Sequence, residues 1–329
     1  MRETLCTHLC CPDCRSDLDL DSHEQDDAEI LSGTLSCPAC DQRWPIVRGV
    51  PRFVPDDLPR DVRHTARNFG TSWRIWNDID DDRYRRQLLE WLPLLSPDDV
   101  RNRTLLDGGC GKGRHLRVMA GFGARAVIGV DVSDAVDVAY ANTRALPNVH
   151  VVQADLQHLP LRDDFDLAYS IGVIHHTPEP QRCFEAIAGH VRPGGTVACW
   201  VYGRENNGWI VWLVNPIRIG LTRYLPARAL RVVAWVLAAV LHVVIAAVYR
   251  PAEAVGARLF YREYLLNLRR LGFAETHHIV YDHLAAPTAH YLRREEVQTW
   301  LDHAALSDTC VTWVHRNSWA AIGERRMAG

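Results

Sequence analysis

The chain has 329 residues, 47% of them hydrophobic, and a formal net charge of −3. This length can form one large domain and a small one, and the near-neutral charge gives no global electrostatic reason to expect a nucleic-acid partner. The amino terminus shows no apolar segment preceded by positive charge, so we expect a cytoplasmic protein without a secretory signal.

Two Cys-x-x-Cys pairs stand near the amino terminus. Each pair turns two sulfur atoms toward one point, and two pairs together form a closed four-thiolate site of the kind that holds structural zinc. We therefore predict a zinc-binding module over residues 1–55, followed by cap helices over residues 56–103. Cys6 and Cys10 are alternative ligands with less suitable spacing. The predicted zinc ligands are Cys11, Cys14, Cys37 and Cys40.

A nucleotide-binding pattern begins at Thr104, where a short apolar run ends in Asp107 and a glycine-rich turn and a helix follow. Gly109 and Gly111 would let the backbone approach a ligand closely. Two further apolar runs end in Asp131 and Asp155. Because parallel strands present their carboxyl ends at one edge of a sheet, these acids are predicted to gather around one ligand.

Residues 104–203 therefore predict an α/β fold with a Rossmann-like sheet. Residues 288–329 are predicted to add a helix and a closing antiparallel hairpin.

At these residues the chain resembles the class I S-adenosylmethionine (SAM)-dependent methyltransferases. Residues 107–113 match their first motif, and residues 175–178 and 192–195 resemble landmarks of the branch that contains the ubiquinone/menaquinone methyltransferases. The resemblance implies SAM as cofactor, Asp131 on its ribose, and Asp155 and Leu156 at its adenine. Residues 1–55 are similar to the zinc ribbon of the Trm112 family. The predicted cofactor contacts are Phe69, Asp107, Gly109, Gly111, Asp131, Val132, Asp155, Leu156 and Ser170.

Methyl transfer requires alignment of the acceptor with the sulfonium and, for some acceptors, a base. His175 and His176 follow the fourth strand, so either could be the base, or both could cap the next helix. Tyr202 is a further candidate for a catalytic role. The Asn-Pro-Pro-Tyr motif of nucleobase and protein-amide methyltransferases is missing after Ser170, which argues against those acceptors.

Residues 204–287 form an insertion that the minimal fold does not need. Its apolar stretch, residues 229–248, has the length of a membrane span, but His242 near its centre disfavours that interpretation. We predict a helical cap over the acceptor pocket, with the apolar helix bordering that pocket. Arginines flank this helix, which leaves contact with a membrane surface open.

These patterns predict a SAM-dependent methyltransferase whose acceptor is a small-molecule or lipid-linked metabolite. We expect the methylated atom to be oxygen, with nitrogen and carbon as alternatives. Nucleic acid is an unexpected partner on this view, because residues 12–29 of the ribbon are acidic. One alternative is a tRNA or protein methyltransferase that uses the ribbon for recognition. Another is a SAM-binding protein that does not transfer methyl. The oligomeric state stays open.

Overall fold

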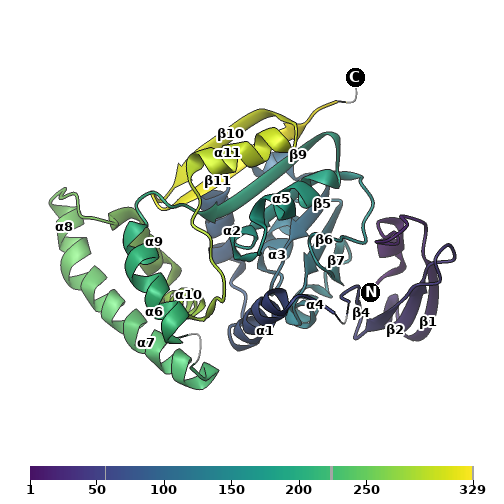
Figure 1. Ribbon diagram of the computed structural model, residues 1–329, viewed down its shortest axis with the longest axis horizontal. Coiled ribbons are helices and arrows are strands. Elements are labelled where there is room, and N and C mark those ends of the chain that lie inside the picture. Colours follow the sequence, from purple (N-terminus) through teal and green to yellow (C-terminus); the bar gives the residue numbers. More distant parts are fainter. Residues whose placement is uncertain (56, 223–224, 328–329) are drawn as a thin grey trace.

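The computed structural model describes residues 1–55, 57–222 and 225–327. The amino-terminal ribbon lies at one end of the molecule, a mixed sheet with its helices at the centre, and the helical insertion at the other end (Figure 1). The α/β Rossmann-like fold predicted from the sequence is confirmed.

The ribbon is a four-stranded antiparallel sheet in the order β1-β2-β3-β4. Its strands are β1 (Asp19–Asp26), β2 (Glu29–Ser36), β3 (Arg43–Val47) and β4 (Val50–Pro51). Four short strands enclose only a small core of their own. Ile30, Leu35 and Ile46 are nevertheless buried, because they belong to the same apolar cluster as one face of the central sheet. The ribbon is therefore joined to the larger domain by a shared core.

The central sheet has seven strands in the order β10-β11-β9-β8-β5-β6-β7. Neighbours among β5 to β9 are parallel, whereas β11 pairs antiparallel with both β9 and β10. The strands are β5 (Thr104–Gly108), β6 (Ala126–Asp131), β7 (Val149–Gln153), β8 (Phe165–Ile171), β9 (Val191–Tyr202), β10 (Leu306–Val314) and β11 (Ser318–Arg325).

Alternate side chains of each strand enter opposite cores, as the two-residue period of a strand requires. In β5, Leu105 packs with α2, α3 and α4, whereas Leu106 packs on the side of α5 and α11. These helices and the preceding α1 are α1 (Arg60–Ile75), α2 (Asp81–Trp91), α3 (Arg114–Gly121), α4 (Ala135–Thr143), α5 (Pro180–Gly189) and α11 (Arg294–His303). Both faces of the parallel strands are covered, so their sequences are almost continuously apolar.

The insertion leaves the sheet after β9, and the regular elements among its described residues are helices joined by short loops. A π-helical turn, Ile210–Val214, leads into α6, and a second one, Ile245–Tyr249, joins α7 to α8. The helices are α6 (Asn215–Gly220), α7 (Ala227–Val244), α8 (Arg250–Ala254), α9 (Arg262–Leu271) and α10 (Phe273–Ala285). α10 lies between α7 and the central domain, where it also contacts α1.

Candidate cofactor and methyl-transfer site

The turn after β5 can be built only with glycine. Gly109 has φ +92°, and a Cβ atom there would lie 2.4 Å from the Val173 side chain. Gly111 has φ +53°, and its Cβ atom would lie 2.8 Å from Nε1 of Trp73. Both positions are left-handed as well as crowded, so the loop keeps a bare backbone at the edge of the sheet.

Asp131 at the end of β6 holds this loop in place. One carboxylate oxygen accepts a hydrogen bond from the Gly111 backbone N–H (2.9 Å), and the other accepts from the backbone N–H and hydroxyl of Ser133 (2.8 and 2.7 Å). Burial raises the pKa of Asp131, although these three donors act in the opposite direction. A carboxylate has further acceptor positions for the hydroxyls of a ligand.

One cavity with about 1310 Å³ of empty space, partly open to solvent, lies over the carboxyl ends of the strands. Its size and its position suit a cofactor built on one nucleoside together with an acceptor group. The glycine cradle, the partly buried carboxylate of Asp131 and the apolar side chain of Leu156 fit SAM. The predicted residues that line this cavity are Phe69, Gly109, Asp131, Val132, Asp155, Leu156, His176 and Tyr202.

Four predicted residues lie behind the cavity wall: Asp107, Gly111, Ser170 and His175. Oδ2 of Asp107 is buried without a partner among the described residues, and burial raises the pKa of this carboxyl to about 7. Ser170 donates to the Gly108 carbonyl (2.6 Å), which ties β8 to β5. His175 is fully buried against Tyr202, with 4.0 Å between ring centres. Ser170 and His175 therefore do not line the cavity, and their predicted roles stay predictions.

His176 is the histidine that the fold brings to the cavity. Its Nδ1 lies 2.6 Å from the Thr288 carbonyl, and its ring lies 5.0 Å from that of Phe69. Burial lowers the pKa of His176 to about 4, so the imidazole is neutral near pH 7. A neutral ring that donates from Nδ1 to a carbonyl keeps Nε2 as a proton acceptor.

A charged cluster on α10 completes the cavity, and the sequence analysis missed it. Glu275, His278 and Asp282 lie at helical spacing and all face the cavity. His278 lies 3.0 Å from Asp282, and Glu275 lies 3.5 Å from Arg114. Burial alone would lower the pKa of His278, but the two carboxylates outweigh it and raise this pKa to about 9. The i, i+3, i+7 spacing of these three residues was the available signal.

Aromatic rings form much of the remaining wall, from segments far apart in the sequence. Trp91 and Trp200 stack with 4.1 Å between ring centres, and Trp73 meets His278 edge-on at 4.7 Å. Phe69 and Tyr202 complete the set of five rings that line the cavity. Such a wall can hold a flat, weakly polar group by stacking.

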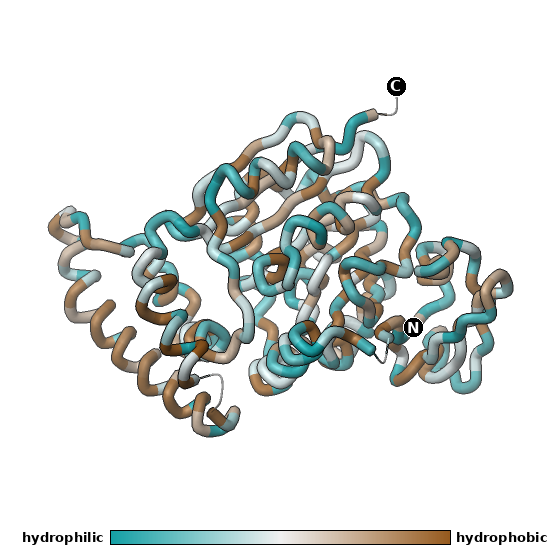
Figure 2. The backbone as a smooth tube through the Cα atoms, viewed as in Figure 1, coloured by the Kyte–Doolittle hydropathy of each residue, from teal (hydrophilic) through white to brown (hydrophobic). Residues whose placement is uncertain are grey.

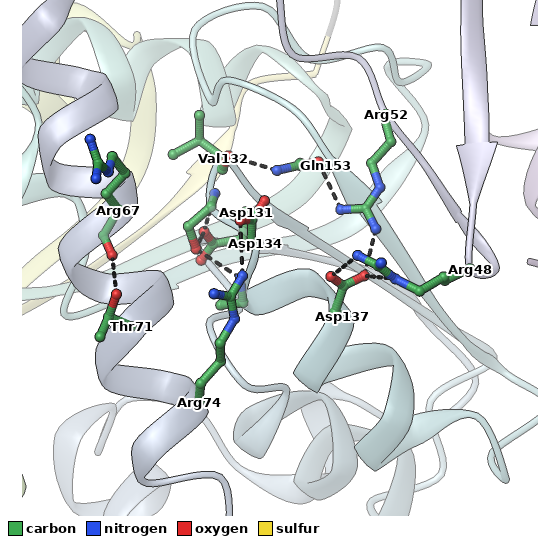
Figure 3. A network of polar contacts seen from close by, with 12 residues as sticks. Arg48, Arg52, Arg67, Thr71, Arg74, Asp131, Val132, Asp134, Asp137 and Gln153 are labelled. Carbon is green, nitrogen blue, oxygen red and sulfur yellow. Dashed lines mark hydrogen bonds and ion pairs between the residues drawn. The ribbon is translucent and has the colours of Figure 1, made fainter.

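The ribbon reaches the cofactor edge of the sheet through Arg48, which precedes β4, and Arg52, which follows it (Figure 3). Arg52 donates to Oε1 of Gln153 (2.8 Å) and to Asp137 (2.5 Å), and Arg48 pairs with the same carboxylate (2.5 Å). Gln153 in turn donates to the backbone carbonyl of Val132 (3.1 Å), which lines the cavity. Burial opposes the two guanidinium groups, which nevertheless hold the pKa of Asp137 below its usual range.

The four predicted zinc ligands converge at the tip of the ribbon. The Sγ atoms of Cys11, Cys14, Cys37 and Cys40 all lie within 4.8 Å of one another. Cys11–Cys40 and Cys14–Cys37 are 3.6 and 3.4 Å apart. A tetrahedral zinc with about 2.3 Å bonds needs sulfur atoms about 3.8 Å apart, so the donor set fits structural zinc. Cys6 and Cys10 are not members of this cluster.

Comparison with known families gives the same two parts. The methyltransferase domain family matches residues 106–199, and the Trm112p-like protein family matches residues 3–49. The chain combines a class I SAM-dependent methyltransferase domain with an amino-terminal Trm112-like module.

Curated relatives correct the predicted acceptor. The tRNA U34 carboxymethyltransferase of Shewanella sediminis is 31% identical over 156 residues, which cover 40% of this chain and 47% of that protein. The tRNA U34 carboxymethyltransferase of Shewanella oneidensis is 29% identical over 173 residues, which cover 46% of this chain and 49% of that protein. The chain thus spans about half the length of these relatives. They are named for tRNA, so the predictions of a small-molecule or lipid-linked acceptor, of the ubiquinone-like branch and of no nucleic-acid partner are wrong.

Solved structures with a similar fold include a SAH complex of DhpI, with 16% identity and a TM-score of 0.49 over 80% of this chain and 97% of that one. A complex between the Haloferax volcanii Trm112 methyltransferase activator and a methyltransferase has 13% identity and a TM-score of 0.44. The match covers 79% of this chain and 98% of that one.

The structure also corrects the position predicted for the apolar helix. The described residues of α7 contribute nothing to the cavity lining, because α10 lies between the two. Among the described helices of the insertion, α10 is therefore the one that lines the cavity, and it carries titratable groups rather than a continuous apolar surface.

Proposed function

We propose that the protein transfers a methyl group from SAM to a nucleotide of tRNA. The main observation in support is that one cavity is lined both by the predicted cofactor residues at the ends of β5 and β6 and by five aromatic rings. Enzymes that modify a base take it out of its stack and hold it against aromatic side chains. The relatives that are tRNA U34 carboxymethyltransferases support the same substrate class. A tRNA substrate also implies work in the cytoplasm.

The chain's own residues supply alignment and a proton acceptor. SAM provides a methyl group already activated by its sulfonium charge. Gly109 and Asp131 hold the cofactor, and the neutral His176 accepts a proton from the attacking atom through Nε2. α1 and α10 pack together and both line the cavity, so they reduce the access of water, which strengthens electrostatic interactions inside.

A basic side of α1 supports an RNA substrate. Arginines 60, 63, 67 and 74 are exposed on this side, roughly a third of a turn around the helix from the residues that line the cavity. Arg74 pairs with Asp134 at 2.9 Å (Figure 3), whereas Arg67 forms no ion pair with another described residue. Guanidinium groups at this position can neutralise backbone phosphates while a nucleotide enters the cavity. The basic surface lies on α1, not on the acidic ribbon.

Transfer of label tests the proposal directly. Purified protein is incubated with radiolabelled SAM and, separately, with unmodified tRNA, ribosomal RNA, total protein and a lipid extract. We expect label in tRNA, located by nucleoside mass spectrometry, and at least about a hundredfold loss of rate in His176→Ala if it acts as the base. Label confined to lipid or protein overturns the proposal.

Charge removal on α1 tests the binding surface. The triple variant Arg60→Gln, Arg63→Gln, Arg67→Gln should bind tRNA about tenfold more weakly at moderate salt. The slope of log affinity against log salt concentration should fall by the amount expected for about three lost phosphate contacts. Its control removes three exposed arginines elsewhere: Arg101→Gln, Arg182→Gln and Arg294→Gln. Equal loss in both variants would show that net charge alone matters and that α1 is not the binding surface.

A further inference from the structure

The outward face of α7 is apolar over most of its length. Eight exposed residues of α7 form this face, and Val248 continues it in the π-helical turn that follows. No charged residue interrupts them between Arg231 and Arg250. The most exposed are Val243 (66%) and Val232 (63%). Figure 2 shows the hydrophobic colour along this helix at the edge of the molecule. The nine residues are Val232, Val233, Trp235, Val236, Leu237, Val240, Val243, Val244 and Val248.

This distribution is the reverse of that in a helix on a water-exposed surface. Leu230, Ala234 and Ala238 form the buried stripe that packs on α10, and two of the three are only methyl-sized. The larger side chains point outward, where a soluble helix carries polar groups. Contiguous apolar surface of this extent marks an interaction site.

The neighbouring segment repeats the pattern. Trp212 is 77% exposed and Leu213 is 61% exposed in the π-helical turn before α6. Ile217, Ile219 and Leu221 are also exposed, in and directly after α6. The apolar surface therefore belongs to the insertion as a whole, because two separate helical segments contribute to it.

Charge identifies the partner. Residues 206–252 contain five arginines and no aspartate or glutamate. Arg228 and Arg231 are exposed at the amino-terminal end of the apolar face, and Arg250 is exposed just beyond its carboxyl-terminal end. Cations at both ends of an apolar helix, with tryptophan between them, suit a helix lying in the headgroup region of an anionic bilayer.

We propose that α7 and the α6 segment dock the protein on an anionic membrane surface, with α7 lying in the plane of the interface. Length and composition would also allow the helix Ala227–Ala254 to cross a bilayer. Its small-residue face is held by α10, however, and the other side of α10 lines the methyl-transfer cavity. Docking through the outward face leaves that cavity accessible. The proposal is independent of the identity of the methyl acceptor.

A second copy of the chain fits this face less well. A two-fold symmetric contact through this face would bring Arg228, Arg231 and Arg250 of one copy close to the same arginines of the other copy. Residues 206–252 contain no carboxylate that could neutralise these charges. Anionic lipid phosphates provide that compensation.

Vesicle flotation with the zinc-loaded full chain tests the proposal. We expect binding to vesicles of equimolar phosphatidylglycerol and phosphatidylcholine, weakened by salt, and little binding to phosphatidylcholine alone. The double variant Val236→Asp, Val240→Asp should lose about tenfold in vesicle affinity while retaining its circular dichroism spectrum and SAM binding. The control is Val47→Asp, Met327→Asp, which changes exposed apolar residues outside the insertion.

Three results would overturn the proposal. The first is an absence of binding to either vesicle, and the second is unchanged binding by the Val236→Asp, Val240→Asp variant. The third is light scattering that shows a dimer converted to a monomer by these substitutions without any vesicle binding, which would assign the face to a second copy. Replacing Arg228, Arg231 and Arg250 by glutamine should reduce the salt dependence, and an unchanged dependence would count against the charge argument.

Discussion

Asp131 is the residue on which the cofactor loop depends most directly. Its two oxygens accept three hydrogen bonds, from Gly111 and Ser133, and it also lines the cavity. An acid at this point therefore orders the loop in addition to meeting the ligand. The sequence pattern predicted only the contact of Asp131 with the ligand and not its role in ordering the loop.

Replacing Asp131 by asparagine should weaken SAM binding by about tenfold or more. Asparagine has one acceptor oxygen, and its amide nitrogen would face an N–H group of Gly111 or Ser133, so two donors would be opposed. Isothermal calorimetry measures the change. Asp134→Asn is the matched control, because Asp134 is an exposed neighbour that pairs with Arg74. Unchanged affinity in the Asp131→Asn variant would reject the assigned role.

At the scale of elements, the sequence predicted that one apolar helix of the insertion would border the pocket. In the structure, α10 lines the cavity and α7 carries the exposed apolar face. α10 presents Glu275, His278 and Asp282 to the cavity, whereas α7 presents its large apolar side chains to solvent. The ribbon likewise has a role beyond its own fold. Arg52, the residue after β4, donates to Gln153, whose amide in turn donates to the Val132 carbonyl beside the cofactor site.

Loss of zinc should therefore affect SAM binding as well as the ribbon. We expect about one zinc per chain in the native protein and none in a Cys37→Ser, Cys40→Ser variant, measured by elemental analysis. The variant should also bind SAM several-fold more weakly, because β3 and β4 no longer position Arg52. Cys310→Ser, an exposed cysteine outside the cluster, is the control. Full zinc content in the double variant would contradict the ligand assignment.

At the scale of the whole molecule, buried polar contacts join the insertion to the central domain across long sequence separations. Ser72 on α1 donates to Asp282 (2.8 Å), and Tyr84 on α2 donates to Glu275 (2.9 Å). His278 lies between the two carboxylates and is almost fully buried. The charge of His278 therefore contributes to the attachment of α10, together with these hydrogen bonds.

This attachment should weaken in alkaline solution. The pKa of His278 is raised to about 9 in the folded protein, from about 6.5 when unfolded. The stabilisation is therefore complete below pH about 6.5 and is lost as pH rises through about 9. In thermal melts, His278→Gln should be less stable than the native protein near pH 6, and the difference should shrink above pH 9. A difference that stays constant with pH would contradict this prediction.

His277→Gln is the matched control for the pH measurement. His277 is adjacent on α10, but it lies near the Arg231 carbonyl and the Trp76 ring rather than between carboxylates. Its replacement should leave the pH dependence of stability as it is in the native protein.

Local sequence patterns determined the fold class, the cysteine cluster and most of the cofactor edge. Short apolar runs ending in Asp107 and Asp131 are enough to place a glycine loop at a strand end, and two Cys-x-x-Cys pairs are enough to bring four sulfur atoms together. These features depend on residues that are close in the chain or on the regular period of strands. The division of the chain into five segments stays a prediction.

Only the tertiary structure decided which histidine meets the cavity, which helix covers it and which way the apolar helix faces. His175 and His176 are neighbours in the same turn, yet packing buries the first behind Tyr202 and exposes the second to the cavity. α10 comes to α1 across about two hundred residues, and α7 turns its small side chains inward because α10 approaches closely there. Such contacts depend on how separate elements pack together, and no local period in the sequence encodes that arrangement.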